Sequence, residues 1–232
     1  MNCIGIIGAM EIEVDQLKER MSVRSVKKIA GMEFCEGTYG KTEVVIVRSG
    51  IGKVNAAVCT QILADCYHVS AVINTGIAGG LYSDINIGDI VVATEALQYD
   101  MDATGFGYEK GVIPQMPVSV FVSDQALREK AVQLCRKVNA DINVYEGRVI
   151  SGDSFVSENE KKKELWETFK GYCTEMEGAA IAQTAYLNHI PYLVIRAISD
   201  KADGSASVDY STFEAKAVEH TVNLMDALLK EI

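Results

Sequence analysis

The sequence predicts an α/β protein, arranged as a three-layer α/β/α sandwich around a buried, largely parallel sheet. Two observations support this fold class. Short runs rich in β-branched residues alternate with stretches of helical periodicity, and several of the runs are apolar on both faces. We expect strands at residues 4–7, 44–47, 69–74, 89–94, 144–151 and 192–198.

Helices are expected between these strands and packed on the sheet, because apolar residues there recur at helical spacing. Two helix starts also have the form of a capping box, at residues 157–160 and 211–214. The residues that carry the helical spacing are Val54, Val58 and Ile62, then Leu127, Ala131, Leu134 and Val138, and finally Phe213, Ala217, Thr221, Leu224 and Leu228.

Residues 99–117 interrupt this alternation with glycines and prolines, together with Phe106 and Tyr108. We therefore predict a long loop. Long loops in compact domains are usually functional or disordered, and the aromatic residues favour a function. No linker rich in proline, serine or charge divides the chain, so residues 1–232 are expected to form a single domain.

The charge of the chain argues against some classes of partner. The 32 acidic and 22 basic side chains give a formal net charge of −10, which repels nucleic acids and anionic membrane surfaces. We expect a neutral or cationic small substrate instead. The N-terminal segment lacks a basic leader and no apolar run is long enough to span a bilayer, so a cytoplasmic protein is expected.

The cysteines and histidines give no sign of a metal site. The six cysteines lack CxxC spacing and are expected to be reduced and structural. His68, His189 and His220 lie far apart in the sequence and form no metal-binding pair at helical spacing. No bound metal is predicted.

Three carboxylates lie close behind apolar runs: Glu13 after residues 3–9, Glu177 within residues 174–180, and Asp200 at the end of residues 194–200. Ligands of α/β sheets bind beyond the carboxyl ends of the strands, so three acids delivered there could converge on one small molecule. This pattern predicts an active site. Taken singly, each acid could also be a solvated or helix-capping residue.

Two glycine-rich segments also follow predicted strands. Residues 49–53 (SGIGK) can place backbone N–H groups around an anion or polar ligand, but they match neither a Walker motif nor GxGxxG. Residues 74–80 (NTGIAGG) would let the backbone approach a flat ligand closely. A tight turn explains either segment equally well.

Together with four further segments, these two resemble the successive signature blocks of the 5′-methylthioadenosine/S-adenosylhomocysteine nucleosidases. The blocks are GIIGAMEIE (5–13), SGIGKV (49–54), NTGIAGG (74–80), SGDSF (151–155), EMEGAA (175–180) and RAISD (196–200), in the family's order and across essentially the whole chain. The resemblance implies a nucleoside phosphorylase-like fold with a mixed, mostly parallel sheet. It also implies a homodimeric hydrolase of methionine salvage and S-adenosylmethionine by-product recycling, which needs no metal or cofactor.

By this resemblance, the enzyme releases adenine and a thioribose from 5′-thio-substituted adenosines. Asp200 would protonate adenine N7, with Ser199 orienting it, and Glu13 would activate the attacking water. Glu177 would hold the ribose hydroxyls. The other contacts implied are Met176 beside the sugar, Phe155 on the purine, the Val156 backbone at the purine edge, Met10, Ile51 and Tyr210 in the apolar part, Ile77, and Phe106 from the partner subunit. The family more often carries serine at Ile77 and phenylalanine at Tyr210.

The chemistry gives two acids opposite tasks, because cleaving a ribosyl C–N bond builds positive charge on the sugar and negative charge on the purine. Asp200 follows a buried run and can be desolvated enough to carry a proton, whereas an ionised Glu13 can accept one from water. Arg196 is expected to form an internal ion pair with Glu175. For the loop that carries Phe106, the alternative is a lid over its own subunit's site.

Two other functions are considered. A purine nucleoside phosphorylase needs arginines to bind phosphate, but residues 10–13 are acidic and Asn74 stands where an arginine might be expected. A non-catalytic nucleoside-binding protein has no use for Glu13 as a water-activating acid. The sequence does not rank methylthioadenosine, adenosylhomocysteine and 5′-deoxyadenosine as substrates.

Overall fold

The computed structural model describes residues 3–232, which form a mixed α/β fold around a mixed sheet, as the sequence predicts. The strands are β1 (Cys3–Gly8), β2 (Ser22–Ile29), β3 (Met32–Tyr39), β4 (Thr42–Arg48), β5 (Ala71–Gly80), β6 (Ile90–Gln98), β7 (Phe121–Val122), β8 (Val144–Ser151), β9 (Cys173–Glu175) and β10 (Tyr192–Asp200). The helices are η1 (Glu11–Glu13), α1 (Asp15–Arg20), α2 (Lys53–Tyr67), η2 (Thr104–Phe106), α3 (Gln125–Val138), α4 (Asn159–Phe169), α5 (Gly178–Leu187) and α6 (Ala206–Glu231).

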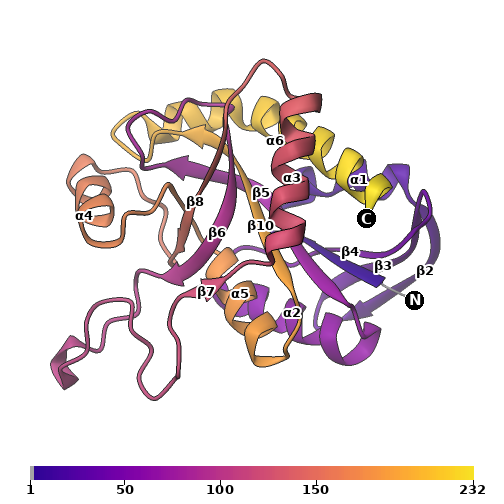
Figure 1. Ribbon diagram of the computed structural model, residues 1–232, viewed down its shortest axis with the longest axis horizontal. Helices are drawn as coiled ribbons and strands as arrows, with labels where there is room; N and C mark the ends of the chain where they lie inside the picture. The colour runs from indigo at the N-terminus through magenta and orange to yellow at the C-terminus, as the bar shows by residue number, and fades with distance from the viewer. Residues whose placement is uncertain (1–2) are drawn as a thin grey trace.

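Helices cover both faces of the sheet. Helices α1, α3 and α6 lie on one face, and α2 and α5 lie on the other (Figure 1). Successive residues of β1 serve the two layers: Ile6 packs in the cluster that contains Leu224 of α6, and Ile7 packs in the cluster that contains Leu63 of α2. A strand buried on both faces explains why this run is apolar throughout.

The sheet is parallel near its centre and closes on itself at one end. β5 pairs in parallel with both β1 and β10, and β8 pairs in parallel with both β6 and β9. Antiparallel pairs of β10 with β6 and of β5 with β9 complete a ring of five strands, β5, β10, β6, β8 and β9. This ring brings the ends of β5, β9 and β10 to one place.

Several elements differ from the sequence-based expectation. Residues 74–80 are the last seven residues of β5 rather than a turn, because they pair with β10 and β9 on either side. The hairpin of β2 and β3 carries many polar residues and was not predicted, since β2 is an edge strand that is mostly exposed. Helix α5 was missed because its small apolar residues are buried almost all round and leave no amphipathic pattern.

Both predicted capping boxes are wrong. Helix α4 begins at Asn159, and its N-cap residue is Glu158 in extended backbone, one position after Ser157. Ser211 lies inside α6, which already begins at Ala206. A turn at Asp203 starts that helix early, because the Asp203 carboxylate accepts the N–H of Ser205 and its carbonyl accepts the N–H of Ala206.

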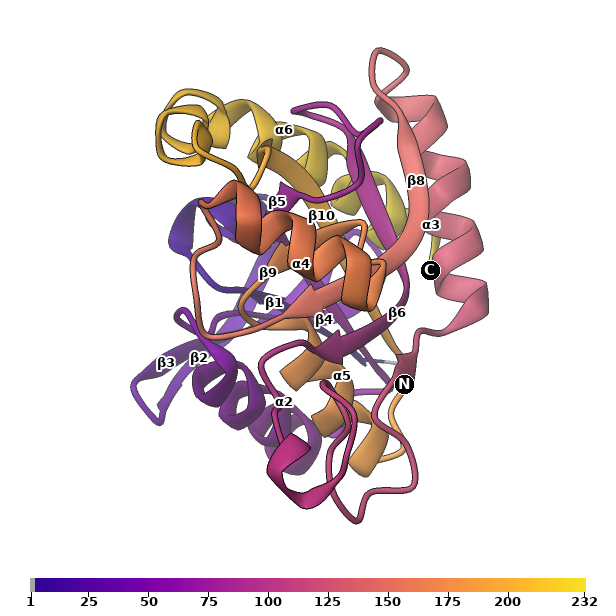
Figure 2. The same cartoon turned by 90° about the vertical axis from the view of Figure 1, so that its left-hand side faces the viewer.

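The loop predicted at residues 99–117 is present and contains one short helix, η2. It extends away from the sheet on the side of α2 and α5 (Figure 2). The Phe106 side chain is 87% exposed at the end of η2. None of the helices within residues 3–232 combines the length and the apolar character that a membrane span requires.

Candidate active site

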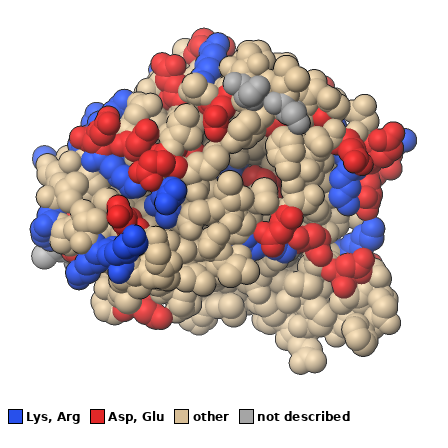
Figure 3. All heavy atoms as spheres, turned by 180° about the vertical axis from the view of Figure 1, so that it is seen from behind, with Lys and Arg blue, Asp and Glu red and all other residues tan. Residues whose placement is uncertain are grey.

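A cavity of about 550 Å³ opens where β5, β9 and β10 end. Seen from behind, the surface of the molecule is hollowed near its middle, and acidic atoms lie inside the hollow (Figure 3). The cavity is lined by Ala9, Met10, Glu13, Ile51, Ile77, Ala78, Gly79, Ser154, Phe155, Val156, Thr174, Glu175, Met176, Glu177, Ser199, Asp200 and Tyr210. All predicted site residues therefore meet in one place, except Phe106 and Arg196, which do not line the cavity.

Glu13 enters the cavity from η1, just after β1 ends. Its Oε2 accepts the N–H groups of Ala9 at 2.7 Å and Met10 at 3.0 Å, and its Oε1 accepts the N–H of Ile77 at 3.1 Å. Burial raises the pKa of Glu13, while Arg196 and the three N–H donors act in the opposite direction. The carboxylate is thus fixed in orientation between β1 and β5, and it is more basic than an exposed glutamate.

Arg196 lies behind the cavity and connects its acidic residues. Its guanidinium forms the predicted buried ion pair with Glu175, donates to Asn74 Oδ1 at 2.6 Å, and lies 3.6 Å from Glu177 Oε2. Burial by itself lowers the pKa of Arg196, but the three surrounding acids Glu175, Glu177 and Glu13 raise it overall. One permanent positive charge therefore compensates the buried carboxylates on this side.

Glu175 and Glu177 flank Met176 but differ in how much hydrogen-bond acceptor capacity their protein partners leave free. Glu175 is occupied by the Arg196 ion pair, the Ser151 hydroxyl and the N–H groups of Glu177 and Gly178. Glu177 Oε1 accepts the N–H of Gly52 at 2.8 Å. Burial, followed by repulsion from Glu175, raises the pKa of Glu177 to about 7. Glu175 is thus a structural anchor, and Glu177 keeps acceptor capacity for a ligand.

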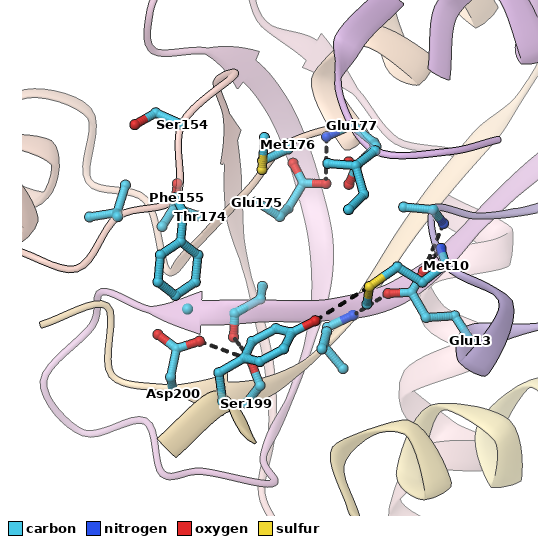
Figure 4. A pocket seen from close by; sticks show the side chains of 17 residues that line it. Met10, Glu13, Ser154, Phe155, Thr174, Glu175, Met176, Glu177, Ser199 and Asp200 are labelled. Atoms are coloured by element: carbon cyan, nitrogen blue, oxygen red, sulfur yellow. Dashed lines mark hydrogen bonds between the residues drawn. The ribbon is translucent and has the colours of Figure 1, made fainter. Parts of the chain in front are cut away.

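Asp200 is the last residue of β10 and faces Phe155 across the cavity (Figure 4). Its Oδ2 accepts the Ser199 hydroxyl at 2.9 Å and its Oδ1 accepts the Ala202 N–H at 2.7 Å. Burial raises the pKa of Asp200, although these two hydrogen bonds lower it. Within residues 3–232 Asp200 forms no ion pair with an arginine or lysine, whereas Arg196 lowers the pKa of both Glu13 and Glu177. Asp200 is therefore suited to carry a proton.

Aromatic and sulfur-containing side chains complete the wall. Phe155 is half exposed and stands edge-on to Tyr210, with ring centroids 6.1 Å apart. The Tyr210 hydroxyl lies 3.3 Å from Met10 Sδ and donates to Glu214 at 2.9 Å. A flat apolar ligand can be held here between Phe155 and the acid at the end of β10.

The sequence-based analysis missed five lining residues: Ala9, Ala78, Gly79, Ser154 and Thr174. Ala9, Ala78, Gly79 and Ser154 lie inside segments already singled out, so their position in those motifs was an available signal. Thr174 begins the singled-out segment 174–180, but it belongs to β9, a strand of three residues that no periodicity could reveal. Among residues 3–232, no group of three or more His, Cys, Asp or Glu side chains is arranged to hold a metal ion.

The fold and this cavity define a protein of the phosphorylase superfamily, whose family model matches residues 3–230. A curated relative from Bacillus cereus, a 5′-methylthioadenosine/S-adenosylhomocysteine nucleosidase, is 40% identical over 230 residues, which cover 99% of each chain. The chain belongs to the 5′-methylthioadenosine/S-adenosylhomocysteine nucleosidase family.

Solved structures agree along the whole chain. The nucleosidase of Neisseria meningitidis in complex with methylthio-immucillin-A has a TM-score of 0.95 and 36% identity, with 100% of both chains covered. The futalosine hydrolase of Helicobacter pylori has a TM-score of 0.94 and 31% identity, covering 100% of this chain and 98% of the other. The nucleoside phosphorylase-like fold implied by the sequence is therefore confirmed.

Proposed function

We propose that this chain hydrolyses the N-glycosidic bond of 5′-methylthioadenosine and S-adenosylhomocysteine, releasing adenine and the corresponding thioribose. The observation that carries the proposal is the pairing, in one cavity, of an acid suited to carry a proton, Asp200, with a carboxylate oriented by three N–H donors, Glu13. The related nucleosidases of known name support the choice of substrates.

In the proposed mechanism, the purine lies against Phe155 with its N7 toward Asp200. The Asp200 carboxyl donates its proton to N7, which neutralises the leaving group as the C–N bond breaks. The hydrogen bonds from Ser199 and Ala202 then stabilise the resulting carboxylate. Val156 is buried beside Phe155 and can offer its backbone to the purine edge.

The sugar end of the substrate is assigned to Glu13, Met176 and Glu177. Glu177 accepts hydrogen bonds from the ribose hydroxyls, and Glu13 takes a proton from the water that attacks the anomeric carbon. The negative charge of both acids also favours the cationic sugar of the transition state. Arg196, which is paired with Glu175 behind the cavity, lies 3.6 Å from Glu177 Oε2 and also favours the charged form of Glu13.

Phosphorolysis is disfavoured by the charge of the lining. None of the described residues that line the cavity is lysine or arginine. Arg196, the nearest guanidinium to Glu13 and Glu177, is already bonded to Glu175 and Asn74. A phosphate nucleophile would therefore meet acidic groups where a phosphorylase needs cationic ones.

We further propose that the enzyme is a homodimer in which residues 99–117 of each subunit complete the partner's site. Ile51 lines the cavity and is 53% exposed, and the exposed Val54 and Val58 follow it along α2. Phe106 is not among the residues that line its own cavity. Such an apolar face beside an open site favours a partner subunit as its cover over an intrachain lid. Action in the cytoplasm stays a prediction from the sequence.

The test is adenine release from a panel of nucleosides by the purified protein. We expect release from methylthioadenosine and adenosylhomocysteine, and measurement of 5′-deoxyadenosine beside them ranks the 5′ groups. Futalosine is included, with release of its own base, hypoxanthine, as the readout, because a structural relative is named for its hydrolysis. Binding without release of the base from any of these nucleosides would identify a non-catalytic nucleoside-binding protein instead.

A further inference from the structure

We propose that Lys53 is a positioning residue for the reaction: with Asp100 and Asp153 it clamps the start of α2 so that the Gly52 N–H is held on Glu177. This inference rests on the proposed role of Glu177 as the acceptor of the ribose hydroxyls. Through its ion pair with Asp100, Lys53 also connects residues 99–117 to Glu177. Lys53 does not line the cavity, and it acts only through Gly52 and Glu177.

The backbone carries the first half of the clamp. Two successive N–H groups at the start of α2 point to two carboxylates: that of Gly52 to Glu177 Oε1 at 2.8 Å, and that of Lys53 to Asp153 Oδ1 at 2.9 Å. Gly52 has a φ of +99°, a conformation that glycine adopts without strain. The Gly52 residue is therefore anchored on both sides, by Glu177 at its own N–H and by Asp153 at the N–H of Lys53.

The Lys53 side chain carries the second half. Its ammonium group donates to Asp100 Oδ1 at 2.6 Å and to Gln98 Oε1 at 3.0 Å, and its side chain is only 18% exposed. The other oxygen of Asp100 accepts the N–H of Asp153 at 3.0 Å. Asp100 thus ties together the lysine and the aspartate that anchor the turn before α2.

Three segments distant in sequence are joined by these bonds: the SGIGK turn, the SGDSF turn and the start of residues 99–117. Gln98 extends the connection, because its amide donates to Gln183 of α5 at 2.5 Å. A shift of residues 99–117 would consequently move the only N–H group that the described structure gives to Glu177 Oε1. Loop position and ribose binding are coupled by a continuous path of hydrogen bonds.

The experiment is a double-mutant cycle between Lys53→Met and Glu177→Gln, with kcat/KM measured on methylthioadenosine and on its 2′-deoxy analogue. We expect Lys53→Met to lower kcat/KM on methylthioadenosine by about 10- to 100-fold, mainly through KM. The loss caused by Lys53→Met should be several-fold smaller on the 2′-deoxy analogue. On methylthioadenosine, adding Lys53→Met to the Glu177→Gln variant should lower kcat/KM by less than about 3-fold. Lys53→Arg keeps the cation and should restore most of the activity.

Lys230→Met is the matched control, because Lys230 also makes a 2.6 Å ion pair, with Asp226, at the far end of α6. It should leave both substrates unaffected. The role of Lys53 would be overturned if Lys53→Met lowered kcat/KM equally on the two substrates. It would also be overturned if the losses from the two single substitutions simply multiplied in the double variant. Both outcomes are possible even where Glu177→Gln itself behaves as proposed. If Glu177→Gln shows no dependence on the 2′-hydroxyl, the ribose assignment fails and the inference falls with it. Far-ultraviolet circular dichroism and thermal melting verify that each variant is folded.

Discussion

Each carboxylate of the cavity has a different set of partners, and these partners decide its task. Glu13 accepts three backbone N–H groups and is also stabilised electrostatically by Arg196, whereas Asp200 accepts one hydroxyl and one N–H group. Glu175, in contrast, has its oxygens occupied by protein groups. The sequence placed these acids at strand ends, but only the folded chain separates acid, base and anchor.

At the residue scale, Asp200→Asn and Glu13→Gln should each reduce kcat by about 10²- to 10⁴-fold, because each removes a proton-transfer group while keeping the side-chain volume. Initial rates of adenine release, with melting temperatures to verify folding, provide the measurement. Retention of more than roughly a tenth of the wild-type kcat by either variant would contradict its role.

Glu177 should leave a signature in the pH dependence of stability. Its pKa rises from the model-compound value of 4.5 to about 7 on folding, so the folded protein holds the proton more tightly than the unfolded chain. Its contribution to the free energy of unfolding is therefore fully present below pH 4.5 and is lost as the pH rises to about 7.

Urea denaturation of the wild type and Glu177→Gln between pH 5 and pH 8 tests this sign. Relative to the wild type, the variant should gain on the order of 1–3 kcal/mol in free energy of unfolding across this range. A constant difference between the two proteins at all pH values would show that Glu177 has an ordinary pKa.

At the scale of elements, the sequence predicted the strands that are apolar on both faces and the helices with a clear apolar stripe. It missed β2, β9 and α5, because an exposed edge strand, a strand of three residues and a helix of small buried residues lack a distinctive period. The glycines of residues 74–80 were interpreted either as allowing close approach to a flat ligand or as forming a turn, but Gly76 serves close packing. A Cβ built on Gly76 would collide with the Arg196 guanidinium and would lie 2.5 Å from Glu13 Oε1.

Gly76→Ala should therefore displace the ends of the Glu13 and Arg196 side chains rather than unfold β5. We expect a loss of about 10²-fold in kcat, since a misplacement near 1 Å has this effect on catalysis, with a cost in stability of about 1–3 kcal/mol. Gly204→Ala is the control, because an added Cβ there meets no atom within 4 Å. Kinetics and urea denaturation are compared, and a Gly76→Ala enzyme with wild-type kcat would refute the close-packing argument.

At the scale of the whole molecule, the closed ring of strands brings the acids together, and an exposed apolar face lies beside the cavity. The order of strands around the ring depends on antiparallel pairs between elements far apart in the chain, which local periodicity does not encode. Only the resemblance to the nucleosidases pointed to a mixed sheet. The partner that would receive Phe106 is likewise beyond what local patterns can predict.

The shared-site model predicts complementation between two defective subunits. Heterodimers of Asp200→Asn and Phe106→Ala contain one site with an intact Asp200 that also receives Phe106 from its partner. Their kcat/KM should exceed that of either parent homodimer. Differently tagged subunits allow the heterodimer to be isolated and its adenine release measured. An isolated heterodimer that is no more active than the Phe106→Ala parent would support an intrachain role for Phe106.

Whether water rather than phosphate attacks the base-protonated nucleoside can be decided by identifying the sugar product. Methylthioadenosine is incubated with the enzyme in phosphate-free buffer and in excess phosphate, and the products are separated and identified by mass spectrometry. We expect adenine and free 5-methylthioribose at the same rate in both buffers. Formation of 5-methylthioribose 1-phosphate as the main product, at a rate that depends on phosphate, would contradict this expectation.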